Sequence, residues 1–402
     1  MSPTGTCVDD PHQTLFMSVV QSRQPRTSYH PLVMRSAELE ATRVSTEPRA
    51  ERGVLARYAE FLPLTAATPA LSLAEGDTPL LAAPRLAKWV GVDDLHLKYE
   101  GANPTGSFKD RGMVVAVAKA IEAGSTTIIC ASTGNTSASA AAYAARAGIA
   151  AVVLLPAGKV ARGKLAQAIM AGATVITLDG NFDQALSVAR DLARDFRVAL
   201  VNSVNPHRIA GQTTAAFEVC DALGDAPDVV ALPVGNGGNV TAYSEGFRIY
   251  RDANRSTRMP VFIGAQAAGA APLVHGAPVE NPETVATAIR IGNPASWTQA
   301  VNAVTSSGGE FSAVTDDVIL EAYHKVAELE GVFCEPASAA GIAALRIAIR
   351  NRRVAPQVRA VCVLTGNGLK DPDRAMPETF SATVLPADAA ALAKQLDLSP
   401  RS

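Results

Sequence analysis

The chain has 402 residues, of which 48% are hydrophobic, so it is long enough to bury the core of two or three ordinary domains. Its formal net charge is only −2 and its short basic clusters lack interleaved aromatic residues, which argues against a nucleic-acid partner. Apolar runs are shorter than a membrane span and the first residues lack a secretory pattern, so we expect a cytoplasmic protein with no membrane partner.

Residues 1–54 are rich in Ser, Thr, Arg, Glu and Pro without steady periodicity, and we expect a poorly ordered N-terminal extension there. After it, short β-branched runs alternate with helical stretches. Each run is too apolar for a half-exposed strand, which predicts buried parallel strands. These runs are 127–131, 151–155, 174–178, 198–202, 229–234, 261–265 and 360–364.

Helices are predicted between these strands, for example over 137–147, 183–196 and 316–330, the last with Thr315 or Asp316 as N-cap. The alternation is typical of an α/β fold with open, twisted parallel sheets covered on both faces. In such sheets, ligands bind where the carboxyl ends of strands turn into helices. We therefore look for chemistry at those junctions.

The five cysteines are far apart and show no paired spacing, so neither disulfides nor a metal site is expected. All but the first lie in apolar surroundings typical of reduced core cysteines. They are Cys7, Cys130, Cys220, Cys334 and Cys362.

The segment 103–112 reads NPTGSFKDRG, a tight loop that turns into a helix. Ser107 is the predicted N-cap, with Asp110 as its capping-box partner, which places Lys109 in the first helical turn. The helix dipole and the nearby Arg111 should lower the pKa of Lys109, leaving more free amine to form a Schiff base. Taken alone, Lys109 could equally be a solvated surface lysine.

The run GNGGN at 235–239 follows a predicted strand and precedes a helix. Three glycines in five residues expose backbone N–H groups at a helix N-terminus, which suits a single phosphate group. The alternative is a tight turn that merely needs the glycines. The run lacks the Lys and Ser or Thr of a nucleotide-triphosphate loop.

Two further junctions carry polar side chains. The run STGNT at 132–136 opens a small-residue helix and suits a carboxylate, and the amide of Asn135 could bond a phenolic oxygen next to an imine. Plain N-capping is the alternative. Thr365, at the end of the last predicted strand, could form a turn or face a pyridine nitrogen, which a neutral hydroxyl cannot hold protonated as a carboxylate could.

Together with EGDTPL at 75–80 and VNSVNPHR at 201–208, these segments resemble the tryptophan-synthase-β, or fold type II, family of pyridoxal-phosphate enzymes, and within it the threonine synthases. The resemblance covers about residues 55–375. It implies that Lys109 holds pyridoxal 5′-phosphate as a Schiff base and moves protons, that Asn135 bonds the 3′-oxygen of the ring, and that Thr365 faces the pyridine nitrogen. It assigns the cofactor phosphate to Gly235, Asn236, Gly237, Gly238 and Asn239.

The resemblance also implies a substrate and a reaction. O-phospho-L-homoserine and water would become L-threonine and phosphate, the last step of threonine biosynthesis, catalysed by a carbon–oxygen lyase acting on a phosphate ester. The substrate carboxylate would lie on Ser132, Thr133 and Thr136. The substrate phosphate would lie on Arg208, whose fork can donate two parallel hydrogen bonds. The residues expected nearby are Asn202, Ser203 and Asn205.

The expected architecture has a large cofactor-binding domain from residues 55–98 and 199–390, and a small mobile domain from residues 99–198. The cofactor would lie in the cleft between them. Closure of the small domain over the substrate would protect reactive intermediates from water. Members of this family are commonly homodimers, and we expect one here.

The serine/threonine dehydratases of the same family, which eliminate only at Cβ, are the alternative function. Three features favour the synthase: the string SFKDRGM at 107–113, the asparagines among the glycines at 235–239, and Thr365, where dehydratases usually have Ser or Cys. Cysteine-synthase-like enzymes fit less well.

Two hypotheses come from other functional classes. A non-catalytic binding protein with this fold would have no need for Lys109. A dinucleotide-binding oxidoreductase would need a glycine fingerprint and a ribose-binding acid, which the sequence lacks.

Overall fold

The computed structural model describes residues 53–156, 162–180, 182–376 and 381–399. Apart from its last two residues, the extension predicted over 1–54 lies outside the described residues, as does Cys7. The strands are β1 Leu80–Ala82, β2 Asp94–Tyr99, β3 Thr127–Ala131, β4 Ala150–Pro156, β5 Thr174–Leu178, β6 Val198–Leu200, β7 Val229–Pro233, β8 Val261–Ala267, β9 Glu310–Val314 and β10 Arg359–Leu364.

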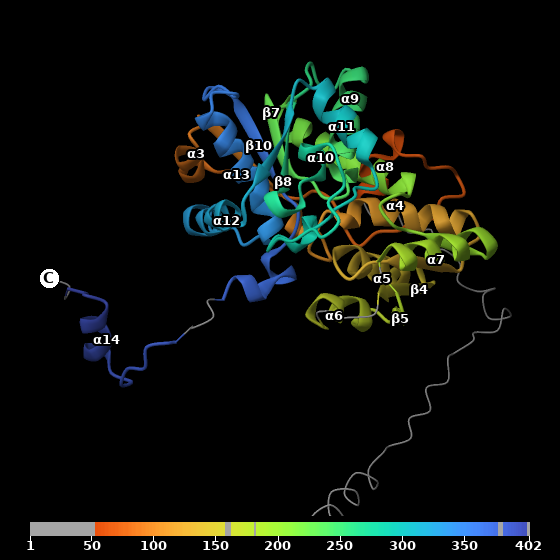
Figure 1. Cartoon of the computed structure of the whole chain (residues 1–402), viewed down its shortest axis with the longest axis horizontal. Helices are drawn as coiled ribbons and strands as arrows, with labels where there is room; N and C mark the ends of the chain where they lie inside the picture. The colour runs from red at the N-terminus through yellow and green to blue at the C-terminus, as the bar shows by residue number, and fades with distance from the viewer. Residues whose placement is uncertain (1–52, 157–161, 181, 377–380, 400–402) are drawn as a thin grey trace, which may run out of the picture. The chain divides into compact units, whose positions relative to one another are not determined.

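Helices alternate with these strands along most of the chain (Figure 1). They are α2 Val54–Arg57, α3 Pro84–Val90, α4 Lys109–Glu122, α5 Asn135–Ala147, α6 Arg162–Met170, α7 Phe182–Asp195, α8 Pro206–Leu223, α9 Gly238–Asp252, α10 Pro272–His275, α11 Trp297–Ser306, α12 Asp316–Glu330, α13 Pro336–Arg350 and α14 Ala389–Gln395. Thr315 is the N-cap of α12, one of the two residues that the sequence allowed.

The strands form two sheets. One has six strands in the order β1-β2-β10-β7-β8-β9, and the other has four in the order β5-β4-β3-β6. Every pairing is parallel except that of β1 with β2. All seven predicted strands are present, which confirms the α/β fold with parallel sheets, whereas β1, β2 and β9 were not predicted.

Both faces of the six-stranded sheet are covered. Val230 of β7 packs in a core shared with α8, α9 and α11, whereas its neighbours Val229 and Ala231 pack in a second core shared with α3, α12 and α13. Figure 1 shows these two groups of helices on opposite sides of the sheet. Because successive strand residues face opposite sides, a strand buried on both faces must be apolar throughout, which explains the continuous apolar runs.

Both edge strands of the four-stranded sheet depart from the prediction, since the three residues of β6 are only half-buried and β5 is more exposed still. The residues 174–178 do form β5, but three of the five are exposed, and Ile176 keeps 41% of its surface accessible. β5 is an edge strand that pairs only with β4, so it lacks the neighbour that would bury its other side. The prediction that this run is buried was wrong.

The prediction of buried, reduced cysteines is confirmed for the described residues. Four free thiols are buried, those of Cys130, Cys220, Cys334 and Cys362. Among the described helices, none combines the length and the apolar character needed to cross a bilayer.

Helices α4 and α8 cross with their backbones in contact. A Cβ atom on Gly211 of α8 would lie 2.0 Å from the carbonyl oxygen of Arg111, and one on Gly112 of α4 would lie 2.4 Å from that of Arg208. Only glycine fits at these two positions, because a side chain would force the helices apart. The crossing therefore fixes the start of α4, which carries Lys109, beside the start of α8, which carries Arg208.

Candidate active site

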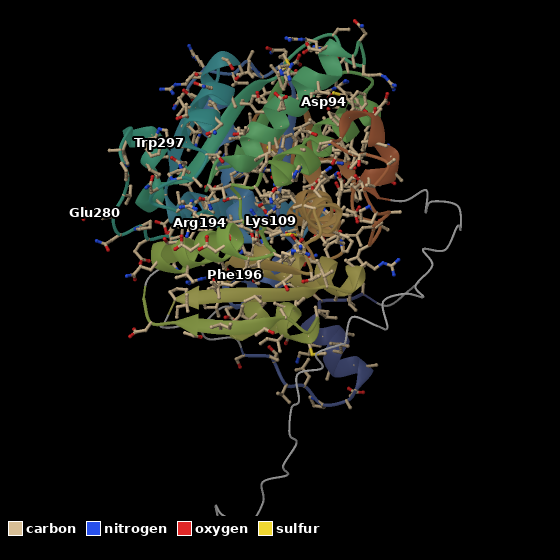
Figure 2. The ribbon with its side chains drawn as sticks, turned by 90° about the vertical axis from the view of Figure 1, so that its right-hand side faces the viewer. Asp94, Lys109, Arg194, Phe196, Glu280 and Trp297 are labelled. Atoms are coloured by element: carbon tan, nitrogen blue, oxygen red, sulfur yellow. The ribbon has the colours of Figure 1, made fainter. Side chains whose placement is uncertain are left out.

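The loop before α4 is held against the end of β10. The backbone N–H of Phe108 donates to the carbonyl oxygen of Thr365 at 3.1 Å, and that of Asn367 donates to Gly106 at 2.9 Å. Ser107 and Gly366 form an isolated antiparallel bridge. These bonds place Lys109, the first residue of α4, next to the strand end that carries Thr365 (Lys109 is labelled in Figure 2).

The predicted capping box is wrong. Phe108 occupies the N-cap position, and the hydroxyl of Ser107 only accepts a long 3.4 Å bond from the N–H of Lys109. The carboxylate of Asp110 accepts instead from the N–H and hydroxyl of Thr105, at 2.7 and 2.6 Å, and from the hydroxyl of Ser139 at 2.6 Å. Asp110 thus closes the loop and ties it to α5, which is why it does not reach back to cap α4.

The amine of Lys109 has an unusual proton affinity. Burial, reinforced by the positive charge of Arg208, lowers its pKa to about 7, while the carboxylate of Glu335 opposes that shift. The direction was predicted but its cause was not. Arg111 does not contribute, because its guanidinium is paired with two carboxylates, so that its charge is neutralised locally.

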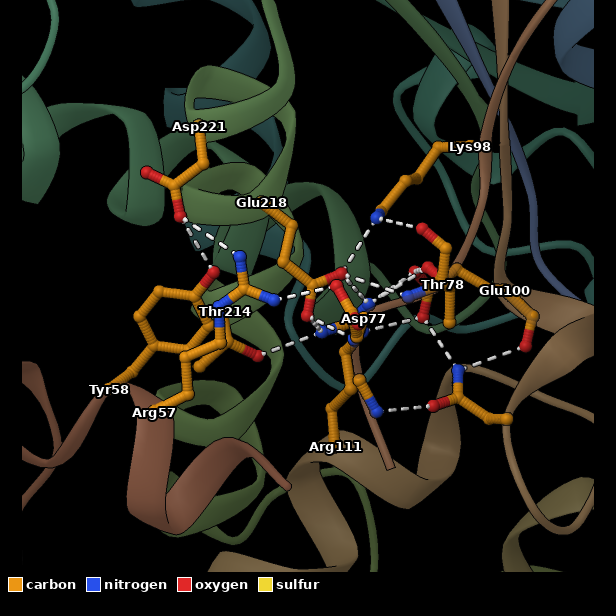
Figure 3. Close-up of polar contacts among 12 residues, drawn as sticks. Arg57, Tyr58, Asp77, Thr78, Lys98, Glu100, Arg111, Thr214, Glu218 and Asp221 are labelled. Atoms are coloured by element: carbon orange, nitrogen blue, oxygen red, sulfur yellow. Dashed lines mark hydrogen bonds and ion pairs between the residues drawn. The ribbon is translucent and has the colours of Figure 1, made fainter. Parts of the chain in front are cut away.

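Those pairs belong to a buried ionic network (Figure 3). Arg111 donates to Glu100 at 2.7 Å and to Glu218 at 2.6 Å, and Lys98 donates to Glu218 at 2.7 Å. All four side chains are at most 4% exposed, and their formal charges cancel. Because β2, α4 and α8 each contribute to this network, it anchors the helix that carries Lys109 to two other elements.

Arg208 is buried with unused hydrogen-bonding capacity. Its side chain is fully inaccessible, and one terminal nitrogen donates to the carbonyl of Val201 at 2.7 Å. Within the described chain, its Nε and Nη2 atoms have no partner. Burial lowers its pKa to about 10. A buried cation with free N–H groups is costly unless an anion meets it, so this position suits an anionic ligand.

The glycine run 235–239 forms the turn between β7 and α9. Gly237 has φ +82°, and a Cβ atom there would lie 2.8 Å from the Cβ of Ala300 and 2.9 Å from the carbonyl oxygen of Ser296. The turn therefore needs glycine, and it leads into the first N–H groups of α9, which no helical carbonyl can satisfy. The amide of Asn236 is used structurally, accepting from the N–H of Ala295 at 3.3 Å.

Gln212 joins this turn to Arg208. Its amide nitrogen donates to the carbonyl oxygen of Arg208 at 3.0 Å, and its amide oxygen accepts from Asn239 at 3.2 Å. The Oδ1 atom of Asn239 is buried and has no partner among the described residues. Sequence reasoning missed Gln212, because a glutamine inside a helix gives no signal of its own.

The side chains of Asn135 and Thr365 both bond Glu335, a residue that the sequence analysis did not identify. Glu335, the residue before α13, accepts from Asn135 at 3.1 Å and from Thr365 at 3.0 Å. Its carboxyl group is buried, and burial raises its pKa, while the bonds from Asn135 and Thr365 oppose the rise. The available signal was an acidic residue in the apolar stretch GVFCEPASAA at 331–340.

The predicted substrate residues have different surroundings. Asn202 bonds the backbone of Ala131 through both amide atoms, at 2.9 and 3.0 Å. Asn205 caps α8 by accepting from the N–H of His207 at 2.9 Å. Ser203 lines a cavity of about 990 Å³ formed mainly by α8, α9 and α11, which Lys109 does not line.

Within the turn at 132–136, Asn135 takes part in these contacts through its bond to Glu335, whereas its neighbours Ser132, Thr133 and Thr136 do not. Ser132 accepts from the N–H of Gly134 at 3.2 Å, and Thr133 and Thr136 are half-buried beside it. No hydrogen bond among the described residues joins this turn directly to Lys109. Thr365 is linked to the start of α4 through the bond from Phe108 to its carbonyl, and the charges of Arg208 and Glu335 act on the amine of Lys109.

Comparison with known proteins identifies the family. A family model described as "Pyridoxal-phosphate dependent enzyme" matches residues 71–366. The threonine synthase of Mycobacterium leprae is 58% identical over 347 residues, covering 86% of this chain and 96% of that protein. The threonine synthase of Halalkalibacterium halodurans is 58% identical over 338 residues, covering 84% of this chain and 95% of that protein.

Among solved structures, that of maize serine racemase matches with a TM-score of 0.63 at 20% sequence identity, covering 80% of this chain and 91% of that chain. At that identity the likeness shows the shared fold alone. The predicted fold class and cofactor dependence are thus confirmed. The chain belongs to the pyridoxal-phosphate-dependent enzymes and, within them, to the threonine synthases.

Proposed function

We propose that the protein converts O-phospho-L-homoserine and water into L-threonine and phosphate, with Lys109 as the reactive residue. The observation that carries this proposal is the fully buried Arg208, which keeps two free N–H-bearing nitrogens and whose charge acts on Lys109. A dehydratase acting on serine or threonine would have no substrate phosphate to satisfy that guanidinium. The phosphorylated substrate therefore fits this site better.

The described residues fit pyridoxal 5′-phosphate. The turn 235–239 offers backbone N–H groups at the start of α9 to the cofactor phosphate, and Lys109 offers an amine with a pKa of about 7. We assign Asn135 to the 3′-oxygen of the ring and Thr365 to the pyridine nitrogen. When bound, the cofactor withdraws electrons from the α-carbon of the substrate and so makes protons at Cα and Cβ easier to remove.

Substrate binding divides between two sets of residues. Arg208 holds the substrate phosphate through its free nitrogens, and we assign Ser203 to the same phosphate because it precedes α8, the helix that carries Arg208. Asn202 and Asn205 place this loop, because their amides bond the backbone at Ala131 and at the start of α8. The substrate carboxylate binds to the turn that contains Ser132, Thr133 and Thr136.

Lys109 moves the protons of the reaction. With a pKa of about 7, a large fraction of the amine is neutral at physiological pH and can accept a proton. It takes the proton from Cα and then helps to remove one from Cβ, after which phosphate leaves from Cγ and is held by Arg208. A proton returned to Cγ makes the methyl group of threonine. Water then adds its hydroxyl to Cβ while its other proton passes to the released phosphate, and a proton returned to Cα completes the product. The released phosphate stays beside Lys109 and helps to deliver this water.

The test compares two products and one variant. The purified protein should show the visible absorption band of an imine, and it should release phosphate and threonine from phosphohomoserine faster than it forms ketobutyrate from threonine. Lys109→Ala should lose both the band and the turnover, whereas Lys88→Ala, the same change at an exposed lysine of α3, should keep both. A colourless protein that takes up no cofactor, or predominant ketobutyrate formation, would refute the proposal.

We further propose that the protein works as a homodimer in the cytoplasm, without a nucleic-acid or membrane partner, and that residues 99–198 form a small mobile domain against a large one from 55–98 and 199–390. Near-zero net charge supports the absence of a nucleic-acid partner. A four-stranded sheet built from strands between 127 and 200, which fall almost wholly within residues 99–198, supports the small domain. Sedimentation analysis tests the dimer. Small-angle scattering with and without substrate tests domain closure.

A further inference from the structure

We propose that Glu335 is a positioning residue that shares one proton with the pyridine nitrogen of the cofactor through the hydroxyl of Thr365. The inference rests on the proposed function, since it places the cofactor ring against Thr365. It assigns to Glu335 the control of the charge on the ring, which a neutral hydroxyl alone could not exert.

The two residues that we assign to the cofactor ring, Thr365 and Asn135, both bond the same carboxylate. One oxygen of Glu335 accepts from the hydroxyl of Thr365 at 3.0 Å, and the other accepts from the amide of Asn135 at 3.1 Å. The side chain is 4% exposed. A Cβ atom on Gly366 would lie 2.6 Å from the carboxyl carbon, so the neighbouring backbone closes tightly around this group. Glu335 is thus confined behind both residues that we assign to the ring.

The hydroxyl of Thr365 can donate only one hydrogen bond, which limits how it can bond the ring nitrogen. A threonine hydroxyl has one hydrogen to donate and two lone pairs to accept with. The hydroxyl of Ser338 lies 3.0 Å from that of Thr365 and accepts from the N–H of Gly366 at 3.2 Å. When Glu335 is ionised, Thr365 donates to it, Ser338 donates to Thr365, and the remaining lone pair of Thr365 can only accept. Thr365 then binds a protonated ring nitrogen.

The opposite protonation state reverses the chain. When Glu335 carries the proton, its O–H donates to Thr365, and the hydrogen of Thr365 is free to donate to an unprotonated ring nitrogen. The two states contain the same number of protons. One proton leaves the ring nitrogen for the oxygen of Thr365 as the hydrogen of Thr365 passes to Glu335, so the chain balances without any further donor or acceptor.

The surroundings of Glu335 keep both states accessible. Burial favours its neutral form, while the hydrogen bonds from Asn135 and Thr365 and the charges of Lys370 and Lys109 favour its ionised form. The amine of Lys370 is held nearby by the carbonyl oxygen of Thr105 at 3.0 Å. Cys334, the preceding residue, is kept as a neutral thiol, because burial raises its pKa. Opposing influences of this kind bring the carboxyl group into competition with a ring nitrogen for one proton.

The experiment measures the proton on the ring nitrogen directly. The apoprotein is reconstituted with cofactor labelled with ¹⁵N in the pyridine ring, and the ¹⁵N chemical shift is followed with pH. Because the exchange changes no proton count, the wild-type shift should lie between the values of protonated and unprotonated pyridine references and should stay there across the pH range in which Glu335 and the ring together hold one proton. In Glu335→Gln, no carboxylate compensates a charged ring nitrogen or takes up its proton, so the shift should move to the value of the unprotonated reference.

Further variants separate this role from a structural one. Glu335→Asp keeps a carboxyl group and should keep an intermediate shift. Thr365→Val removes the link between Glu335 and the ring nitrogen and should also move the shift to the unprotonated value, which tests the inference even if Glu335→Gln fails to fold. Glu330→Gln is the matched control, because its carboxylate accepts from the backbone of Leu86 at 2.6 Å, away from the site. It should leave the ¹⁵N shift at the wild-type value.

The outcomes also separate this inference from the proposed function. Normal cofactor uptake and turnover, with the same ¹⁵N shift in wild type and Glu335→Gln, would overturn the inference alone. A lower melting temperature of Glu335→Gln with that unchanged shift would show a merely structural residue and would overturn it too. A wild-type protein that binds no cofactor would refute both proposals together.

Discussion

The buried ionic network behind Lys109 allows a quantitative prediction for Glu218→Gln. Glu218 accepts from both terminal nitrogens of Arg111, at 2.7 and 2.6 Å, and from Lys98 at 2.7 Å. It also accepts from the backbone N–H groups of Asp77 and Thr78, at 2.7 and 3.3 Å. Glutamine keeps the size of the side chain but leaves the network with a net positive charge, and its amide hydrogens would face the N–H groups of the cations.

We expect this change to lower the free energy of unfolding by about 3–5 kcal/mol, because it leaves buried charge uncompensated. That is a large part of the roughly 5–15 kcal/mol by which most domains are stable. Turnover should fall too, because Arg111 lies two residues after Lys109 in the first turn of α4. The effect on stability can be isolated by urea unfolding at neutral pH, followed by circular dichroism.

A double-mutant cycle gives the sharpest control. Lys98→Met together with Glu218→Gln restores charge balance inside the network, so the double variant should be more stable than the sum of the two single losses predicts, by about 0.5–3 kcal/mol. A loss below about 1 kcal/mol for Glu218→Gln, or strictly additive losses, would refute the reasoning that charge balance stabilises this region.

The same network sets a pH dependence. Burial raises the pKa of Glu218, but the charges and hydrogen bonds of Arg111 and Lys98 outweigh that effect and hold the pKa well below its ordinary value of 4.5. The stability that Glu218 contributes is therefore present above pH 4.5 and is lost as pH falls towards the folded-state pKa. The difference between wild type and Glu218→Gln should narrow in acid.

Three further changes test the site. Arg208→Met removes buried N–H groups that lack partners among the described residues, so the free energy of unfolding, measured by thermal denaturation, should rise by about 1–3 kcal/mol. The variant should at the same time lose most of its turnover of phosphohomoserine. A less stable variant would contradict this reasoning. Gly211→Ala should lower the free energy of unfolding in urea by about 1–3 kcal/mol, because the new methyl group would lie 2.0 Å from the carbonyl oxygen of Arg111. An unchanged unfolding midpoint would argue against this contact. Cofactor uptake by the apoprotein can be followed by the visible band of the bound cofactor. Its rate should rise as the pH passes through 7 and then level off, because only the neutral amine of Lys109 reacts and its pKa is about 7. A rate that still rises as the pH approaches 10.5, the ordinary pKa of lysine, would contradict this.

The sequence predicts those parts of the fold that follow from local burial. Strands such as β7 and β10 lie inside a parallel sheet, so every residue must be apolar and the run itself reveals them. β5 has the same kind of sequence at the edge of a sheet, and its exposure could not be read from the run, because burial there depends on strand order.

The site divides in the same way. Glycine turns and a lysine at a helix start are local features, and the sequence located them. Glu335 was missed because its meaning comes from partners 30 and 200 residues away, Thr365 and Asn135. The cause of the Lys109 shift was misjudged for the same reason, since Arg111 is neutralised by Glu218, which lies 107 residues further along the chain.

The contact between α4 and α8 sets the distance between two functional residues of the site. Gly112 lies one turn after Lys109 and touches the backbone at Arg208, while Gly211 lies one turn after Arg208 and touches the backbone at Arg111. Two backbones in contact cannot approach further, so the span between the reactive amine and the guanidinium is fixed by the scaffold rather than by a loop. Discrimination between phosphorylated amino acids that differ by one carbon would then reside in this helix crossing, and changing the preferred chain length would require moving a helix.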